Sequence, residues 1–343
     1  MSNLNANKNY MKTKIVYVVI SNDSDIYLEQ AWASAYSARL YNPNAHIVFI
    51  TDEKTRDGII NTKRNNIMSI INEIISVPFP KEINNMKRSR WIKTNLRNLI
   101  KGDILFIDTD TIITGSLNEI DEWDIDLGAV LDIHCHFKTF PHANSVLKLL
   151  KKIYGIHQLK ENTEYFNSGV LYIKDNQRTH LFFSQWHKNW EYSLSKGVAT
   201  DQQSLIKTVD DMPNFITPIS GNYNCQILGS IQYLHTSKIV HFFNAKWNDN
   251  TLCPFFGKDI YMTIKKNRCI TTDIEYQIIH CKELFVSPSI PICSNDTTIW
   301  NSPAFNLLRW INLHYKFLYR TIQFFSKSCL WILKKTKKII RLY

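Results

Sequence analysis

Residues 101–117 read KGDILFIDTDTIITGSL, and this stretch decides how the fold is interpreted. The apolar run 104–107, rich in branched and aromatic residues, predicts a short buried strand. The strand ends on Asp108 and Asp110, and two carboxylates in such a place are unfavourable unless a cation compensates their charge. Mg²⁺ or Mn²⁺ would do so through oxygen ligands while keeping positions open for a phosphate. The alternative on these residues alone is that the pair caps a turn or a helix.

Composition and charge narrow the class of protein. The 343 residues are 44% hydrophobic and 13% aromatic, which is enough for one large globular domain or two modest ones. The net charge is +11, but residues 303–343 hold nine basic residues and no acidic one, which leaves only +2 for the rest of the chain. Because the excess charge belongs to one terminal segment, its distribution argues against a nucleic-acid binder.

Cysteines and the N-terminal sequence indicate where the protein works. Seven cysteines are scattered without a C-x-x-C pair, which is typical of reduced thiols in a cytosolic protein rather than of disulfides or a structural zinc site. The apolar run 15–20 is too short for a signal peptide or a membrane span, so we expect no export signal.

The N-terminal region predicts the start of a parallel sheet. Apolar runs at 15–20 and 46–50 predict buried strands, and residues 26–40 between them predict a helix. Sheets built from such βαβ units bind ligands beyond the carboxyl ends of their strands. The residues expected at this edge, which as an alternative are ordinary turn residues, are Ser21, Asn22, Asp23, Thr51 and Asp52.

A cationic helix is expected just before the acidic pair. Residues 86–102 predict one helix, on which Arg90, Lys93, Thr94 and Arg97 share a face because they are spaced at i, i+3, i+4 and i+7. That face would either contact a diphosphate or remain a solvated surface.

A strand at 126–133 is followed by His134, Cys135 and His136. An H-x-H pattern without a second ligand pair is a weak metal signal, so the motif favours packing or a place in an acceptor pocket over a metal site.

The strand predicted at 165–173 holds a polar side chain, Asn167, just before Gly169. At that edge the backbone is able to approach a ligand closely. Downstream, Asp201 opens a predicted helix, and capping would explain Asp201 but not the adjacent Gln202.

The run 238–247, KIVHFFNAKW, places His241 directly after a short apolar strand. A neutral imidazole suits a Mn²⁺ whose other ligands are carboxylates, and Lys246 nearby suits a phosphate. Taken singly, a histidine in this position is more often a satisfied core residue.

Four motifs in the same order resemble those of one enzyme family. They are GDILFIDTDTIITGSL, YFNSGVLYI, TDQQSL and KIVHFFNAKW. Their order and approximate spacing resemble the retaining glycosyltransferases of family 8, the group of lipooligosaccharide galactosyltransferases and glycogenin. More narrowly, the chain resembles bacterial sugar transferases encoded with capsule or lipopolysaccharide genes. The likeness covers about residues 14–250. It implies the GT-A fold, an α/β domain with a mostly parallel central sheet flanked by helices.

The resemblance implies a role for each matching position. A divalent ion, Mn²⁺ or Mg²⁺, would be held by Asp108, Asp110 and His241 and would bridge the diphosphate of a UDP-sugar. The nucleotide would be bound by Val19, Ser21, Asp23, Arg90 and Lys246, with Arg88 or Lys93 as an alternative to Arg90. The donor sugar and its reacting carbon would be addressed by Asn167, Asp201 and Gln202. The chain departs from the family pattern at Asn244, where a glycine is usual, and at Trp247, which directly follows the lysine.

The implied reaction is the transfer of a hexose or N-acetylhexosamine to a glycan with retention. We expect a front-face mechanism in which the leaving phosphate helps to deprotonate the acceptor, with a covalent intermediate on Asp201 as the weaker option. A sugar nucleotidyltransferase would need a Gly-rich basic loop after the first strand, and residues 21–30, SNDSDIYLEQ, do not form one. A catalytically inactive GT-A scaffold bound to the membrane is the remaining alternative.

We expect three regions: a catalytic domain at 12–255, accessory helices and loops at 256–302, and a tail at 303–343. Seven basic residues of the tail lie near one line of a helix: Arg309, Lys316, Arg320, Lys327, Lys334, Lys338 and Arg341. No uncharged stretch approaches the ~20 residues that a membrane span needs. The tail therefore predicts one or two basic amphipathic helices on the anionic inner face of the cell membrane, near a lipid-linked acceptor. The alternative is a helix packed on the body or on a partner.

Overall fold

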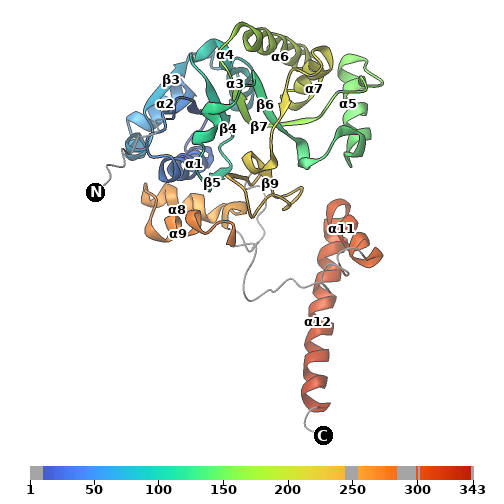
Figure 1. The fold of residues 1–343 in the computed structure, drawn as a ribbon. Coiled ribbons are helices and arrows are strands. Elements are labelled where there is room, and N and C mark those ends of the chain that lie inside the picture. Colours follow the sequence, from blue (N-terminus) through green and yellow to red (C-terminus); the bar gives the residue numbers. More distant parts are fainter. Residues whose placement is uncertain (1–10, 244–253, 284–298, 300–301, 341–343) are drawn as a thin grey trace, which may run out of the picture. The chain divides into compact units, whose positions relative to one another are not determined.

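The computed structural model describes residues 11–243, 254–283, 299 and 302–340. The chain divides into two compact units, Met1–Phe285 and Val286–Tyr343. Figure 1 shows the first unit as a central sheet with helices on both faces. The α/β fold with a mostly parallel sheet that the sequence predicted is therefore confirmed.

In the part of the chain that the structure describes, seven strands form the central sheet in the order β3-β2-β1-β4-β7-β6-β8. The first four of these are parallel to one another, β7 runs antiparallel to both its neighbours, and β8 is parallel to β6. The strands are β1 (Lys14–Val19), β2 (Ile47–Asp52), β3 (Glu73–Val77), β4 (Ile104–Ile107), β6 (Leu127–Leu131), β7 (Phe166–Ile173) and β8 (Thr217–Pro218).

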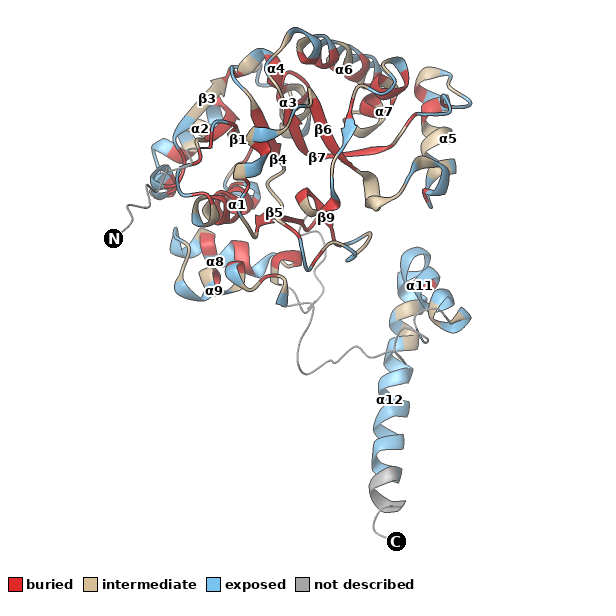
Figure 2. Ribbon diagram, in the orientation of Figure 1, coloured by how far each residue is buried: buried red, intermediate tan, exposed pale blue. Residues whose placement is uncertain are grey.

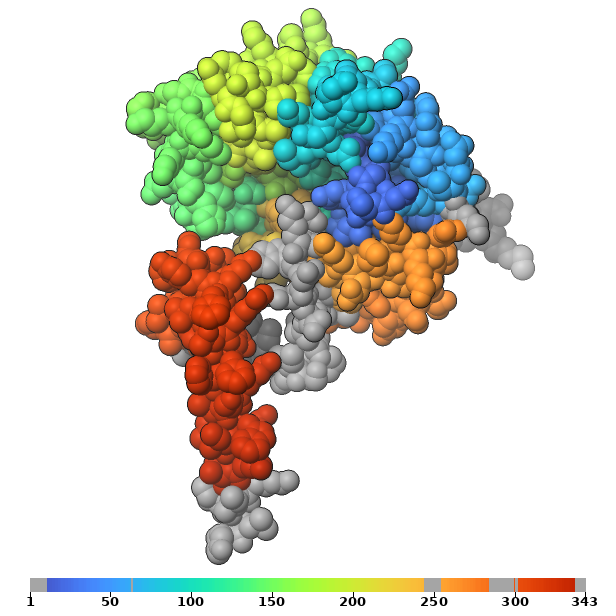
Figure 3. Space-filling view, turned by 180° about the vertical axis from the view of Figure 1, so that it is seen from behind, coloured from blue at the N-terminus to red at the C-terminus, as the bar shows by residue number. Residues whose placement is uncertain are grey.

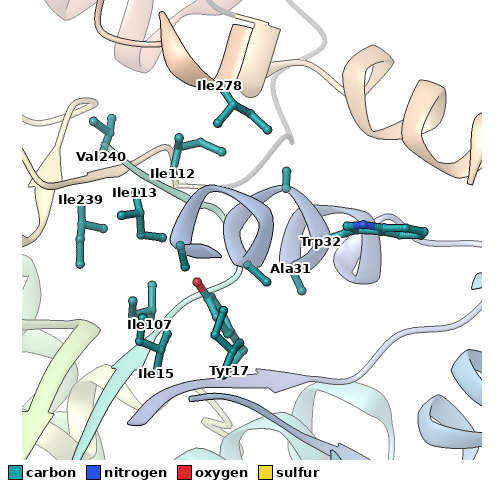
Figure 4. Close-up of a cluster of buried hydrophobic side chains, with 14 of the residues drawn as sticks. Ile15, Tyr17, Ala31, Trp32, Ile107, Ile112, Ile113, Ile239, Val240 and Ile278 are labelled. Atoms are coloured by element: carbon teal, nitrogen blue, oxygen red, sulfur yellow. The ribbon is translucent and has the colours of Figure 1, made fainter. Parts of the chain in front are cut away.

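Burial on both faces explains why the central strands are apolar throughout. Along β1, Tyr17 and Val19 face one hydrophobic cluster, while Val16 and Val18 face the other. Figure 2 shows the central strands buried along their length, and Figure 4 shows Tyr17 packing toward Ala31 on the helix that follows β1. This alternation matters for the site because neighbouring residues of β1 point to opposite faces.

Two groups of helices cover the sheet. One cluster is formed with α1 (Tyr27–Tyr41), α2 (Glu53–Ile60), α8 (Asp259–Asn267) and α9 (Thr272–Ile279). The other is formed with α3 (Asn85–Thr94), α4 (Leu96–Leu99), α6 (Gln177–Ser195) and α7 (Gln202–Asp211). A satellite cluster packs α5 (Ala143–Tyr154) near the start of α7 through Ile206.

The single helix predicted at 86–102 is wrong. The structure ends α3 at Thr94 and begins α4 at Leu96, because Asn95 between them leaves the helical conformation. The Asn95 side chain donates to the Trp91 carbonyl at 3.1 Å, the kind of local hydrogen bond by which asparagine competes with a helix. Arg97 consequently lies on a different helix from Arg90.

A second, three-stranded sheet brings distant parts of the chain together. Its order is β5-β10-β9, with strands β5 (Thr111–Ile113), β10 (Ile239–His241) and β9 (Cys225–Gln226). The antiparallel pairing of β5 with β10 sets His241 opposite Thr111. Because Thr111 directly follows Asp110, this register joins the fourth motif, which carries His241, to the first.

Residues 302–340 of the second unit form the helices α11 (Pro303–His314) and α12 (Lys316–Ile340), which are separated at Tyr315. Large apolar side chains on α12 are widely exposed, including Phe317 at 86% and Phe324 at 68%. Within the described ranges, no helix combines the length and the apolar character required to cross a bilayer. Of the cysteines in the described ranges, Cys135, Cys225, Cys269 and Cys329 are free thiols.

Candidate active site

Two carboxylates and an imidazole meet at the end of β4. One ligand atom from each of Asp108, Asp110 and His241 lies within 4.8 Å of the others. His241 Nε2 lies 3.2 Å from Asp110 Oδ1. The pairing of β5 with β10 brings these side chains together. The local periodicity of the sequence does not predict this contact. Among the described residues, this is the one group of three such side chains with spacing suited to a metal ion.

A chain of hydrogen bonds orients the His241 ring. His241 Nδ1 lies 2.9 Å from Asn224 Oδ1, and the Asn224 amide donates to Asn167 Oδ1 at 2.9 Å. The Asn167 amide in turn donates to Asp132 Oδ1 at 2.8 Å. Since an amide oxygen only accepts, Nδ1 carries a proton and Nε2 is the ring nitrogen that faces the carboxylates. Burial disfavours the charged ring, but the charge of Asp110 and its hydrogen bond with Nε2 raise the pKa of the imidazole, and a metal ion would take the place of the proton on Nε2. Asn167 therefore supports the imidazole from behind, as the outer partners of metal-binding histidines do.

Close packing also holds the ring in place. A Cβ at Gly169 would overlap the His241 ring, so glycine is needed there for the imidazole rather than for a ligand. On the other side, the Phe243 ring stacks on His241 with 4.2 Å between centroids. Phe243 adopts a positive φ of 54°, a conformation that is rare for a bulky residue and occurs mainly where function or packing demands it.

Lys93 links the acidic pair to Asp201. Its ammonium is almost completely buried and lies 3.2 Å from Asp108 Oδ1, 3.2 Å from Asp201 Oδ2 and 3.1 Å from Ser168 Oγ. Arg90, one turn earlier on α3, pairs with Asp201 Oδ1 at 2.8 Å. Both helical cations thus converge on the cluster rather than form a solvated surface. Arg97, which was predicted to share their face, turns away and donates to the Gly102 carbonyl.

The electrostatic environments of the Asp201 and Asp108 carboxyl groups differ. Burial alone would raise the pKa of the Asp201 carboxyl, but the charges of Arg90 and Lys93 hold that pKa well below its usual range. At Asp108, burial raises the pKa of the carboxyl, and the Lys93 ammonium offsets this only in part. The negative charge of Asp201 is therefore fully compensated by neighbouring cations. The negative charge of Asp108 is compensated only in part, so a further cation would stabilise it.

Asp201 and Gln202 do not act as simple helix caps. Asp201 occupies the N-cap position of α7 but makes no capping hydrogen bond within the described part of that helix. The Gln202 amide donates to the Phe166 carbonyl, and Ser168 Oγ donates to Gln202 Oε1 at 3.4 Å. Both residues thus face β7 beside Asn167.

A cavity of about 430 Å³ opens beside the acidic pair. Figure 3 shows this side of the molecule, where the start of α1 lies between α3 and the helices α8 and α9. The acidic pair and the two cations line it together with residues from the end of β1 and just beyond it, from α1 and from α3. These further residues are Val18, Ile20, Tyr27, Gln30, Asn85, Met86 and Ser89.

The side chains predicted to line the uridine are not among those that line this cavity. Val19 is buried in the core, because the twofold period of a strand turns it away from the face that Val18 and Ile20 present to the cavity. Ser21 and Asp23 line a neighbouring cavity of about 530 Å³ instead. The cavity beside the acidic pair is also lined by Tyr27, Gln30 and Asn85, which the sequence analysis did not identify. Tyr27 and Gln30 lie three residues apart at the start of a predicted helix, and that spacing was a signal that they share a face.

The loop that enters α1 is held by ion pairs and backbone contacts. Arg64 pairs with the exposed Asp23 at 3.1 Å and with the buried Glu29 at 2.8 Å. Lys265 of α8 donates to the carbonyls of Asp23 and Asp25 at 2.7 and 2.5 Å. Residues far downstream thereby fix the segment that carries Tyr27.

The remaining predicted positions are resolved as follows. Lys246 lies outside the described residues. His134 accepts a hydrogen bond from the Gln226 backbone, while His136 pairs with Glu164, so the two histidines serve different contacts. The segment instead contributes Asp132, which sequence reasoning missed. Burial raises the pKa of the Asp132 carboxyl, an effect that its hydrogen bond with Asn167 reduces.

Comparison with known proteins supports the fold. No protein-family model matches the chain, and a search of curated proteins finds no match. Among solved structures, a bifunctional glycosyltransferase, WbbM, in its apo form matches with a TM-score of 0.51 and 16% identity over 79% of this chain and 52% of that chain. Galactosyltransferase LgtC with donor and acceptor sugar analogues matches with a TM-score of 0.47 and 16% identity over 77% and 100% of the two chains. Mouse xyloside xylosyltransferase 1 in its apo form matches with a TM-score of 0.46 and 11% identity over 67% and 97%. The likeness to WbbM and the strand order together show that the chain has the α/β fold of GT-A glycosyltransferases.

Proposed function

We propose that the protein is a metal-dependent glycosyltransferase that takes a hexose or N-acetylhexosamine from a UDP-sugar with retention. One observation carries this proposal: Asp108, Asp110 and His241 converge at the edge of a cavity that Arg90 and Lys93 also line. Opposite charges arranged in this way suit a ligand that is itself a metal-bound anion. A diphosphate is such a ligand, and the fold is one that glycosyltransferases use.

The donor atoms fit a divalent ion. Two carboxylates and a neutral imidazole presenting Nε2 form a ligand set that suits Mn²⁺, with Mg²⁺ as the harder alternative. When bound, such an ion supplies electrostatic stabilisation of the negative charge on the departing diphosphate. Asn224 and Asn167 supply the outer support that a histidine ligand requires.

The cations have separate tasks in this proposal. Lys93 is buried and already engaged with Asp108 and Asp201, so it holds the two carboxylates in position. Arg90 is 32% exposed and lines the cavity, so its free N–H groups are placed to donate to phosphate oxygens. Lys246 would add a further phosphate contact, as the family resemblance implies.

The compensated state of Asp201 favours front-face transfer. Arg90, Lys93 and Ser168 all contact its carboxylate oxygens, which lowers the nucleophilicity of the group. We therefore assign Asp201 and Gln202 to positioning the donor sugar, with the leaving phosphate accepting the proton of the acceptor hydroxyl. In this proposal Asn167 contributes mainly by supporting the orientation of the His241 ring. Detection of a glycosylated Asp201 peptide by mass spectrometry would overturn this assignment.

The experiment that tests the function is a panel of UDP-sugars incubated with the full chain and Mn²⁺. We expect slow hydrolysis of one of the UDP-sugars by the wild-type chain, and loss of that hydrolysis in the Asp110→Asn variant. A sugar nucleotidyltransferase would instead release pyrophosphate from a nucleoside triphosphate and a sugar phosphate. An inactive scaffold would bind UDP without hydrolysing any donor, and that outcome would refute an enzymatic role.

We further propose that catalysis belongs to residues 12–255, that 256–302 shape the acceptor side, and that 303–343 attach the enzyme to the inner face of the cell membrane. On α12, Arg320, Lys327 and Lys334 lie on one side, and exposed aromatic rings lie on much of the remainder. A lipid-linked glycan of capsule or lipopolysaccharide synthesis would be reached there. Deleting 303–343 should release the protein from vesicles rich in phosphatidylglycerol, and retention of the truncated protein would contradict the anchor.

A further inference from the structure

The inner face of α1 carries a line of buried polar side chains. Ser34 Oγ lies 3.0 Å from the Tyr17 hydroxyl and 2.8 Å from Thr111 Oγ1. Ser37 Oγ donates to the Ser34 carbonyl at 2.6 Å and accepts from the Ile113 backbone at 2.9 Å. Each of these hydroxyls is thus paired, as buried polar groups normally are.

Gln30, one turn before Ser34, is the exception. Its side chain is only 1% exposed, yet its Nε2 has no hydrogen-bond partner among the described residues. The same residue lines the cavity beside the acidic pair. An unpaired amide is unfavourable in a buried place, so the cavity is where its missing partner is to be expected.

The position of Gln30 along α1 identifies the part of the ligand that it meets. Tyr27, one turn earlier, also lines the cavity and is 40% exposed. Ser34, one turn later, contacts Thr111, which directly follows Asp110. Gln30 therefore lies between the aromatic ring and the acidic pair. A nucleotide with its diphosphate at the acidic pair and its base near Tyr27 places its ribose beside this amide.

We propose that Gln30 is a specificity-determining residue that recognises a ribose hydroxyl of the donor nucleotide. The inference rests on the proposed function, since it assumes a nucleoside diphosphate in the cavity. An amide offers both a donor and an acceptor, which matches a hydroxyl group that also does both. A deoxyribose lacking that hydroxyl leaves the amide unpaired, and sites built around a hydrogen bond discriminate strongly against such analogues.

The test is calorimetric titration of the full chain, in Mn²⁺, with UDP, 2′-deoxy-UDP, 3′-deoxy-UDP and pyrophosphate. We expect the wild-type chain to bind UDP about tenfold more tightly than one of the deoxy analogues. Gln30→Met should abolish that difference and leave pyrophosphate affinity unchanged. Gln185→Met, on α6 and half-buried, is the matched control and should keep the wild-type preference.

Stability provides a second readout. Because Gln30→Met removes an unpaired buried donor, it should leave the unfolding midpoint of the ligand-free chain unchanged or raise it by a few degrees. If the variant weakens UDP, both deoxy analogues and pyrophosphate by one factor, or lowers the midpoint, Gln30 has a structural role and the inference is wrong. If the wild-type chain binds UDP without preferring ribose, the inference alone fails. If it binds no UDP at all, the proposed function fails first.

Discussion

Replacing Lys93 by methionine tests whether one buried cation holds the candidate site together. The Lys93 side chain is 2% exposed and its ammonium is shared between Asp108 and Asp201. Methionine keeps most of the apolar length of the side chain and removes its charge. After the change, Asp201 retains Arg90 as a partner, whereas Asp108 loses the closest positive charge that the structure shows for it.

The expected magnitude follows from the distances. Each carboxylate lies 3.2 Å from the ammonium. At an effective dielectric constant of about 20, one such pair contributes roughly 5 kcal/mol of Coulomb attraction. Much of that attraction is offset by the cost of burying the lysine, and removing one partner of a buried pair typically costs about 3–5 kcal/mol. We therefore expect Lys93→Met to lower the free energy of unfolding by about 3 kcal/mol or more at pH 7 without metal.

Urea unfolding followed by tryptophan fluorescence measures this quantity. The matched control is Lys148→Met, because Lys148 is exposed on α5 and makes no ion pair within the described structure. The control should change the free energy of unfolding by less than about 0.5 kcal/mol. Saturating Mn²⁺ should reduce the loss in free energy of unfolding caused by Lys93→Met, because the dication compensates the negative charge of Asp108 in place of the lysine. A loss below about 1 kcal/mol, or one equal to the control, would refute this reasoning.

Three further changes probe the surroundings of the site. Asn224→Ala removes the acceptor of His241 Nδ1, so Mn²⁺ affinity measured by calorimetry should fall about 10- to 100-fold, and an unchanged affinity would contradict the role of Asn224. Gly169→Ala places a Cβ against the His241 ring, so Mn²⁺ binding should weaken while the far-ultraviolet circular dichroism spectrum stays native, and wild-type binding would count against this packing. For Asp201, the folded pKa lies below the unfolded value of about 3.9, so its carboxylate stabilises the fold above that pH and this contribution is lost as the pH falls below it. Asp201→Asn should therefore be less stable than wild type at pH 7 and should lose less stability on acidification, as urea unfolding across pH would show. Equal acid sensitivity would disprove the account of this carboxylate.

Local patterns predicted the parts of the site that lie on one strand or one helix. The apolar run that ends on Asp108 requires a buried strand, and spacing alone sets Arg90 and Lys93 on one side of α3. Residue chemistry made His241 a possible metal ligand, but its assignment to the acidic pair depended on the family resemblance, because no local period reveals that β5 pairs with β10.

Local patterns were insufficient where a single residue decides the direction of a side chain or the end of a helix. Val19 and its neighbour Val18 are chemically alike, yet the pleat of β1 sends only Val18 to the cavity. Asn95 breaks a helix whose polar spacing continues unbroken in the sequence. The sequence analysis did not identify Asp132 or Gln30, because only the folded structure shows their surroundings. Asp132 accepts a hydrogen bond, whereas the Gln30 amide lacks a partner among the described residues.

The central claim is that a divalent ion held by Asp108, Asp110 and His241 brings a nucleoside diphosphate to this cavity. Titration of the full chain with UDP, with and without Mn²⁺, tests it most directly. We predict one Mn²⁺ per chain, UDP binding that requires the metal, and loss of both in Asp110→Asn. Equal UDP affinity without metal, or wild-type Mn²⁺ affinity in Asp110→Asn, would contradict the claim.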